Sequence, residues 1–267
     1  IQARATMTPT IWGLYANGAE IQTKTGQASS VQFILTPNAD LAISYEIRAT
    51  FPSAPLKEKN RLVGTNQLYN LDYFKQNYLY TGSDLGATYT PEATTFKVWA
   101  PTSSSVKLHI YNVGRPSSVG GTALNDVPFP PTPLMMTRGA KGVFSATVPG
   151  DWNLKYYTYI VTNANGTQEV ADPYAKSAGV NGLRGQIIDF DRYEPEGFDE
   201  LTFTDITSPA DLTVYELHVQ DLTLHETWTG TEANRGKYLG LIEEGTTYTE
   251  GEVTVSTGFD HIKELGG

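Results

Sequence analysis

Short stretches in which apolar and polar residues alternate, each ended by Gly, Pro, Asn or Ser, recur along most of this chain. In an extended strand, residues two positions apart face the same side, so these stretches predict strands with one buried face. Long runs with the 3.6-residue period of an amphipathic helix are nearly absent. This pattern favours a mainly β fold built from antiparallel sheets.

Two strands are predicted near the N-terminus, at residues 31–36 and 43–50. The second has an apolar face formed by Ile43, Tyr45, Ile47 and Ala49. A polar stretch follows, and residues 61–77 are predicted to hold a final strand and a linker. We therefore predict a small N-terminal β-sandwich domain with its linker at residues 1–77.

A second series of strands follows at intervals of roughly ten residues. The dipeptide Asn165-Gly166 favours a hairpin turn, because both residue types accept positive φ. The stretch 114–133 is rich in Pro and is predicted to be irregular. The series predicts a second β-sandwich at residues 78–193, and we expect both sandwiches to be of the immunoglobulin-like type. The predicted strands of the second sandwich are residues 95–100, 106–113, 143–148, 156–162, 168–171 and 185–190.

The sequence changes character after Asp211. Residues 212–219 (LTVYELHV) are a nearly continuous apolar run, which is typical of a strand buried on both faces. Later, residues 258–265 carry apolar side chains at helical spacing. A buried strand followed by a helix predicts the opening of an α/β unit, which is unfinished here because a complete (β/α)8 barrel takes about 250 residues.

Composition restricts the partners and the chemistry. Nineteen Lys and Arg stand against 29 Asp and Glu, a net charge of −10 that disfavours nucleic acid and anionic membrane surfaces. A neutral polysaccharide meets no such electrostatic penalty. The chain has no Cys, which excludes disulfides, thiol catalysis and Cys-ligated metals. Absence of Cys fits an extracellular bacterial protein, either secreted or on the cell surface, and a cytoplasmic location stays open.

Four phrases, taken together, carry a family resemblance. They lie at residues 80–100 (YTGSDLGATYTPEATTFKVWA), 171–189 (ADPYAKSAGVNGLRGQIID), 214–222 (VYELHVQDL) and 257–266 (TGFDHIKELG). In this order they resemble type I pullulanases, debranching enzymes of glycoside hydrolase family 13. Branching enzymes and isoamylases share single phrases and remain an alternative, against which the second phrase argues.

The resemblance implies a role for each part of the chain. Residues 1–77 would be one of the β-sandwich accessory domains that precede the module in such enzymes. Residues 80–191 would be a carbohydrate-binding module of family 48, and residues 194–267 would hold the first strand and helix of an incomplete catalytic (β/α)8 barrel. The parent enzyme would hydrolyse α-1,6-glucosidic branch points in pullulan, amylopectin and limit dextrins with two carboxylates. These lie on later barrel strands, so we expect no catalytic residue in this chain, which alone would be inactive. The rest of the barrel would come from the same gene product or from a second chain.

A few residues are candidates for binding. Sugar rings stack on flat aromatic side chains, so Trp152, in a Gly- and Asn-flanked turn, and Trp228 are candidate contacts for an α-glucan polysaccharide or oligosaccharide. The predicted interface with the barrel consists of Trp99 and of a rigid turn in which Pro fixes φ. This turn contains Asp172, Pro173 and Tyr174.

The module departs from its family at two positions. Family members that bind starch-like glycans independently tend to carry a Trp just before the Asp-Pro turn and a Lys on the preceding strand. The corresponding residues here are Gln168 or Glu169, and Thr158. This departure argues against independent starch binding and favours a module that packs on the barrel as a structural flank.

The remaining polar candidates favour structural roles. Glu216 and Asp221 are interpreted as structural carboxylates rather than as an acid–base pair, and His218 has no second ligand at metal-binding spacing. Acidic stretches at residues 194–200 and 243–252 suit solvated loops better than Ca²⁺ sites. We therefore expect no required cofactor and no metal site, with Ca²⁺ as the alternative.

A stand-alone glycan-binding or surface protein made of sandwich modules is the alternative from another functional class. The predicted strand at residues 212–219 argues against this alternative, because a strand with two apolar faces needs a sheet covered on both sides. Binding of maltooligosaccharides by the isolated chain would favour this alternative.

Overall fold

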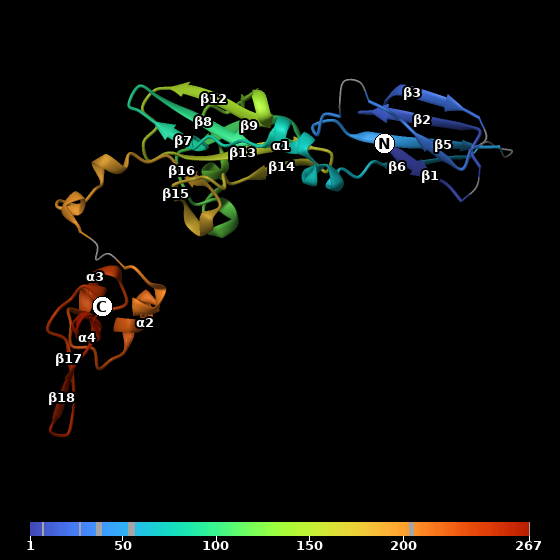
Figure 1. Ribbon diagram of the computed structural model, residues 1–267. Helices are drawn as coiled ribbons and strands as arrows, with labels where there is room; N and C mark the ends of the chain where they lie inside the picture. Colours follow the sequence, from blue (N-terminus) through green and yellow to red (C-terminus); the bar gives the residue numbers. More distant parts are fainter. Residues whose placement is uncertain (7, 27, 36–38, 53–56, 203–205, 267) are drawn as a thin grey trace. The chain divides into compact units, whose positions relative to one another are not determined.

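Antiparallel sheets dominate the chain, which divides into two compact units at residues 194 and 195 (Figure 1). The predicted fold class, mainly β with several antiparallel sheets, is confirmed. No described helix is long and apolar enough to cross a membrane. The computed structural model describes residues 1–6, 8–26, 28–35, 39–52, 57–202 and 206–266.

The first unit begins with a two-stranded ribbon and a four-stranded sheet that share an apolar core. The ribbon pairs β1 (Gln2–Arg4) with β4 (Ser30–Gln32). The sheet has the order β3-β2-β5-β6 and consists of β2 (Ile11–Ala16), β3 (Ala19–Thr25), β5 (Tyr45–Phe51) and β6 (Lys57–Leu62). Its core comprises Trp12, Leu14, Phe33, Tyr45, Ile47, Ala49 and Phe51.

Local sequence accounts for much of this arrangement. Asn17 and Gly18 have φ of 48° and 84°, which suits the tight turn between β2 and β3. Alternate residues of β5 are buried, as the period-two pattern predicts for residues 43–50. The strand predicted at residues 31–36 is shorter, at β4, and residue 36 lies outside the described residues.

The linker predicted within residues 61–77 instead contains a helix. Helix α1 (Asp72–Tyr78) follows a 3-10 turn at Asn66–Asn70. Seven residues make fewer than two helical turns, too few for a recognisable apolar period and too few for stability in isolation. The helix therefore depends on contacts that a local sequence pattern does not contain.

Two further antiparallel sheets pack face to face in the rest of the first unit (Figure 1). One has the order β11-β12-β8-β7, and the other has the order β10-β9-β13-β16-β15, with β14 paired to β13. The strands are β7 (Gly86–Tyr89), β8 (Ala93–Trp99), β9 (Ser103–Tyr111), β10 (Leu134–Met135), β11 (Thr137–Arg138), β12 (Val143–Pro149), β13 (Tyr156–Asn163), β14 (Gly166–Val170), β15 (Ser177–Ala178) and β16 (Gly185–Gln186). The core comprises Phe96, Val98, Val106, Leu108, Ile110, Met136, Phe144, Val148, Tyr157, Tyr159 and Ile187.

Most strands predicted for this sandwich are present within a few residues of their predicted bounds. The hairpin at Asn165-Gly166 joins β13 to β14, and Gly166 has a φ of 111°. The Pro-rich loop before β10 contains only short 3-10 turns, at Ser117–Val119 and Ala123–Asp126. The closing strand predicted at residues 185–190 is only two residues long, and a 3-10 turn follows it at Phe190–Arg192.

The second unit contains short helices and one hairpin. The hairpin pairs β17 (Thr247–Glu250) with β18 (Val253–Ser256). The helix predicted at residues 258–265 is confirmed as α4. The helices are α2 (Val219–Leu224), α3 (Tyr238–Leu241) and α4 (Gly258–Glu264), with 3-10 turns at Phe198–Glu200, Pro209–Asp211 and Glu232–Asn234.

The buried strand predicted at residues 212–219 is not formed. Residues 212–218 belong to no helix or strand, and Val219 is the first residue of α2. Side chains predicted to be buried on both faces are exposed, with Val214 at 81% and Leu212 at 50%. A strand exists only through hydrogen bonds to a neighbour, and none of the described residues pairs with this segment.

Candidate glycan-binding surfaces

The outer face of β13 and β14 carries the two positions at which the sequence departs from its family. The hydroxyl of Thr158, on β13, donates a hydrogen bond to the carboxylate of Glu169, on β14. The Tyr111 hydroxyl, on β9, donates to the same carboxylate oxygen, and the His109 Nδ1 atom lies 3.4 Å from it. The structure brings these positions together as a polar network, with no aromatic ring or ammonium group at either.

The Glu169 carboxylate is held in place by hydrogen bonds from within the module. Burial alone would raise the pKa of this carboxyl, but hydrogen bonds from Thr158, Tyr111 and His109 lower it below its ordinary value. Burial and the bond to Glu169 raise the pKa of the Tyr111 hydroxyl, which therefore stays protonated and donates. A sugar hydroxyl that approached Glu169 would compete with groups already bonded to it.

Arg184 covers the same region and was missed by sequence reasoning. Its guanidinium carbon lies 3.6 Å from the centroid of the Tyr111 ring, and only 5% of its side chain is exposed. It donates to the carbonyls of Val113 and Asn125, at 2.9 and 2.8 Å, and to the carboxylate of Asp126, at 2.9 Å. Arg184 thus fixes the Pro-rich loop beside Tyr111. The only sequence signal was one basic residue in the phrase VNGLRG.

The turn predicted as a barrel interface is divided between interior and surface. Asp172 is buried, and its carboxylate accepts hydrogen bonds from the hydroxyls of Tyr157 and Tyr159, at 2.7 and 3.2 Å. It also accepts from the backbone N–H of Tyr174 at 2.9 Å. Burial raises the pKa of Asp172 despite these bonds. Asp172 therefore holds the sandwich together, and Pro173 and the 45%-exposed Tyr174 are the residues on the surface.

The turn between β12 and β13 offers an aromatic surface. The Trp152 ring is half-buried at the edge of the core, and its centroid lies 6.0 Å from that of Phe129, which is 55% exposed. The Trp152 Nε1 atom donates to the Pro149 carbonyl at 2.9 Å, which fixes the ring. Asp151 accepts a hydrogen bond from the Tyr89 hydroxyl at 2.8 Å beside it. Aromatic rings next to planar polar groups suit the apolar faces and hydroxyls of a sugar.

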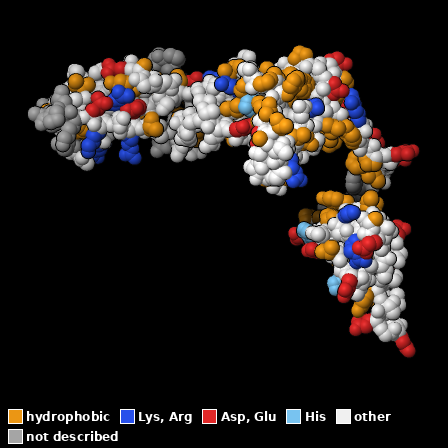
Figure 2. Space-filling model, turned by 180° about the vertical axis from the view of Figure 1, so that it is seen from behind, with side chains coloured by type: hydrophobic (Ala, Val, Ile, Leu, Met, Phe, Trp, Pro, Cys, Tyr) orange, Lys and Arg blue, Asp and Glu red, His pale blue; other side chains and the backbone are white. Residues whose placement is uncertain are grey.

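Apolar side chains are also exposed around this sandwich. Figure 2 shows hydrophobic side chains gathered over one face of the sandwich, whereas charged groups gather over the first sheet. The apolar side chains of this sandwich with at least about half of their surface exposed include Phe129, Met135, Phe190 and Tyr193. Exposed apolar area of this kind is typical of a surface that contacts a ligand or another domain.

The two other candidate tryptophans pack inside the protein. Trp228 is 7% exposed, and the Arg235 guanidinium lies 5.5 Å from its ring centroid, so it offers no free face to a sugar. Trp99 is half-buried, and its Nε1 atom donates to the carbonyls of Tyr78 and Lys141 at 2.8 and 3.0 Å. Its contacts are therefore with helix α1, at the side of the first sheet.

The acidic residues of the second unit do not form a catalytic pair. Glu216 and Asp221 are exposed, and the Nδ1 atom of His218 lies 3.6 Å from the carboxylate of Asp221. A general acid and base that work as a pair lie close together in a site that excludes water, and these two carboxyls are open to solvent. Among the described residues, no group of three His, Asp or Glu side chains is placed to hold a metal.

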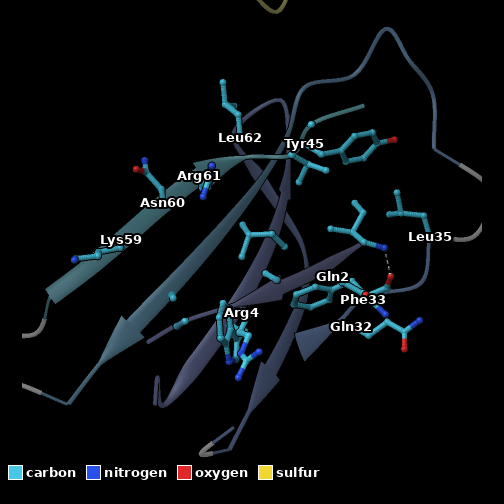
Figure 3. A pocket seen from close by; sticks show the side chains of 18 of the residues that line it. Gln2, Arg4, Gln32, Phe33, Leu35, Tyr45, Lys59, Asn60, Arg61 and Leu62 are labelled. Carbon is cyan, nitrogen blue, oxygen red and sulfur yellow. Dashed lines mark hydrogen bonds between the residues drawn. The ribbon is translucent and has the colours of Figure 1, made fainter. Parts of the chain in front are cut away.

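A large cavity lies between the ribbon and the sheet at the start of the chain (Figure 3). Its volume is about 1500 Å³, and its lining includes Phe33 and Tyr45, whereas the side chains of Lys59 and Asn60 on β6 lie at its rim. The described residues that line it include no Asp, Glu or His, and most of them are apolar, with basic side chains at Arg4, Lys59 and Arg61. The cavity suits apolar contact rather than catalysis.

Comparison with known proteins shows which proteins this chain is similar to. Residues 84–175 match the model of carbohydrate-binding module 48, the isoamylase N-terminal domain. The pullulanase of Bacillus subtilis (strain 168) is 35% identical over 199 residues, which are 72% of this chain and 24% of the relative. The chain is a homologue of the N-terminal part of pullulanases. It spans about a quarter of the length of this curated relative.

Solved pullulanase structures agree with this assignment. The pullulanase from Anoxybacillus sp. LM18-11 matches all of this chain and 36% of its own, with 31% identity and a TM-score of 0.67. The pullulanase from Paenibacillus barengoltzii in complex with maltohexaose and alpha-cyclodextrin matches 72% of this chain and 27% of its own, with 39% identity and a TM-score of 0.60. The resemblance inferred from the four phrases is thereby confirmed.

Proposed function

We propose that this chain is the N-terminal portion of a pullulanase that hydrolyses α-1,6-glucosidic branch points in pullulan, amylopectin and limit dextrins. The observation that supports this proposal most strongly is the match of residues 84–175 to the family 48 module, together with relatives named pullulanase at 35–39% identity. These names favour a pullulanase over a branching enzyme or an isoamylase. Cleavage would follow the retaining double displacement, with both carboxylates on barrel strands beyond the described residues.

Residues 194–267 would form the opening β/α segment of the barrel, after two sandwich domains at residues 1–77 and 78–193. Support comes from the exposed apolar side chains of residues 212–217 and from helix α4. A strand with apolar residues on both faces suits the interior of a parallel sheet. In the parent enzyme, neighbouring strands and helices would cover these side chains.

The module would act as a structural flank that also touches the glucan through the Trp152 turn. The network around Glu169 uses the polar groups of its outer face internally, whereas Trp152 and Phe129 keep aromatic surface open to solvent. The maltohexaose complex of the Paenibacillus barengoltzii relative supports an α-glucan as the ligand class. Tyr174 and the exposed apolar residues of the sandwich would face the barrel.

A hydrolysis assay tests the division between this chain and the barrel. The 267-residue chain, incubated with pullulan, should release no reducing sugar. A chimera in which it replaces the matching N-terminal region of the Bacillus subtilis relative should hydrolyse pullulan. Turnover by the chain alone would contradict the placement of the catalytic carboxylates, and an inactive but folded chimera would contradict the role of flank.

The glucan contact is tested by NMR, because four tryptophans give four indole N–H signals. On titration with maltohexaose, the signal of Trp152, assigned by its loss in Trp152→Phe, should shift. The signal of the buried Trp228 is the internal control and should stay in place. A titration that leaves Trp152 unmoved at millimolar maltohexaose would sink this contact without affecting the assignment to pullulanases.

A further inference from the structure

Helix α1 lies between the first sheet and the sandwich and contacts both (Figure 1). Toward the first sheet, the Tyr73 hydroxyl donates to the carbonyl of Ala39. The N–H of Leu41 donates to the Tyr78 hydroxyl at 3.1 Å, which in turn donates to the Asp40 carboxylate at 3.3 Å. Two tyrosines of one helix thus bind three successive residues of one loop, and Leu41 and Tyr78 are buried.

The other side of α1 is bonded to the sandwich. The Nε1 atom of Trp99, on β8, donates to the carbonyl of Tyr78, and the Lys141 ammonium donates to the carbonyl of Gln76. Carbonyls in the last turn of a helix have no partner within it, so these donors satisfy acceptors that α1 leaves open. The Phe74 ring meets the Trp99 ring edge to face, with centroids 6.2 Å apart, and stacks on Tyr78 at 5.8 Å.

A direct ion pair spans the same joint. The guanidinium of Arg138, on β11, donates to both carboxylate oxygens of Asp40, at 2.9 and 3.1 Å. Both side chains are about one-third exposed, so the pair contributes little stability by itself. Its two parallel bonds do fix a direction, because a bidentate contact allows little rotation. The aromatic packing around α1 therefore supplies the cohesion, and the ion pair sets the angle.

We propose that α1, Trp99 and the Asp40–Arg138 pair form a brace that makes residues 1–194 one rigid body. Consecutive domains joined by a polar linker normally move relative to each other. Here the connecting segment is helical, and its aromatic side chains are bonded and packed on both sides. The cavity of the first sheet and the Trp152 turn are consequently held at a fixed separation.

Distance measurement between two spin labels tests the brace. Because the chain has no Cys, labels attach only at introduced positions, Thr25→Cys on β3 and Ala164→Cys in the β13–β14 turn, both exposed. With the brace intact, double electron–electron resonance should give one narrow distance distribution. In the doubly substituted Tyr78→Ala/Arg138→Ala chain, which loses both the buried ring and the ion pair, it should broaden at least about twofold, because the released domains can reorient.

Matched variants separate the brace from general damage. Arg48→Ala removes an ion pair with Glu46, at 2.7 Å, from a side chain as exposed as Arg138, but within the first sheet alone. This control should keep the narrow distribution. Tyr78→Phe alone keeps the ring and should give an intermediate width, which guards against a double variant that does not fold. A broad distribution with the brace intact, or a width unchanged in the folded double variant, overturns the proposal.

Discussion

The two segments that flank the module use apolar residues in opposite ways. Before the module, residues 64–80 bury Tyr78 and pack Phe74 against Trp99. After it, the described residues among 195–217 leave their apolar side chains exposed, and their hydrogen bonds join positions two or three residues apart. Both segments are rich in apolar residues, so their composition does not decide which is packed. The difference comes from whether neighbouring elements supply partners.

Hydrogen exchange should separate the two segments most strongly. Amides of α1 are held by tertiary contacts, so they should exchange only through large openings of the first unit, whereas residues 206–217 should exchange almost freely. We expect protection factors to differ by at least about 1,000-fold, equivalent to about 4 kcal/mol of opening free energy. Mass spectrometry of short peptides resolves the segments, and comparable protection in both would break the comparison.

Removal of a buried hydrogen-bond acceptor inside the module should lower the free energy of unfolding by nearly as much as the opening free energies of the two segments differ. In Asp172→Ala the hydroxyls of Tyr157 and Tyr159, both fully buried, lose their shared acceptor. We expect the free energy of unfolding to fall by about 3 kcal/mol, because each unpaired buried polar group costs about 1–3 kcal/mol. Urea denaturation measures the loss. Asp172→Asn keeps an oxygen acceptor, so a loss as large as that of Asp172→Ala would contradict this cause.

The packed segment is tested at Trp99. Trp99→Ala removes the half-buried ring beside Phe74 and the donor to the carbonyls of Tyr78 and Lys141. The free energy of unfolding of the first unit should fall by about 2 kcal/mol, below the range for a fully buried Trp. Chemical denaturation followed by circular dichroism measures it. Trp99→Phe, which keeps a ring but no donor, should lose about half as much.

The sequence predicted what depends on local pattern and failed where distant partners decide. Strand β5 and the hairpin at Asn165-Gly166 follow from alternation and turn chemistry, and both were predicted. Helix α1 was missed because its stability comes from residues such as Trp99, distant in the chain. For the site, the family pattern pointed to Thr158 and to Gln168 or Glu169 as departing positions, but the hydrogen bond between Thr158 and Glu169 was not predicted. The buried position of Asp172 was not predicted either, because the tyrosines that bond it give no signal beside the Asp-Pro turn.

The pH dependence of stability sharpens the contrast between buried and exposed carboxyls. Burial raises the pKa of Asp172 in the folded chain, so the folded state binds this proton more tightly than the unfolded state does. The stabilisation is fully present below the ordinary Asp pKa and is lost as pH rises through the raised value. Stability relative to Asp172→Asn should therefore fall as pH rises from about 3 to about 7. A difference that is flat or rises with pH would contradict the sign.

The smallest expected effect lies in the exposed segment. Val214→Ser should change the free energy of unfolding of this chain by less than about 0.5 kcal/mol, since Val214 is 81% exposed and a polar side chain there replaces only hydrated surface. Val98→Ser is the matched control, because Val98 is 6% exposed in β8, and it should cost about 2–3 kcal/mol. Thermal and urea unfolding report both.

The same pair of substitutions also tests the proposed barrel. In a parent pullulanase, residues 212–217 would be covered on both faces, and Val214→Ser should then cost about as much as Val98→Ser, again about 2–3 kcal/mol. The comparison needs both this chain and the parent enzyme. Val214→Ser should leave the free energy of unfolding nearly unchanged in this chain and should lower it in the parent enzyme. Equal small effects at Val214 in both would mean that this apolar run is never buried, and the proposed first barrel strand would have to be abandoned.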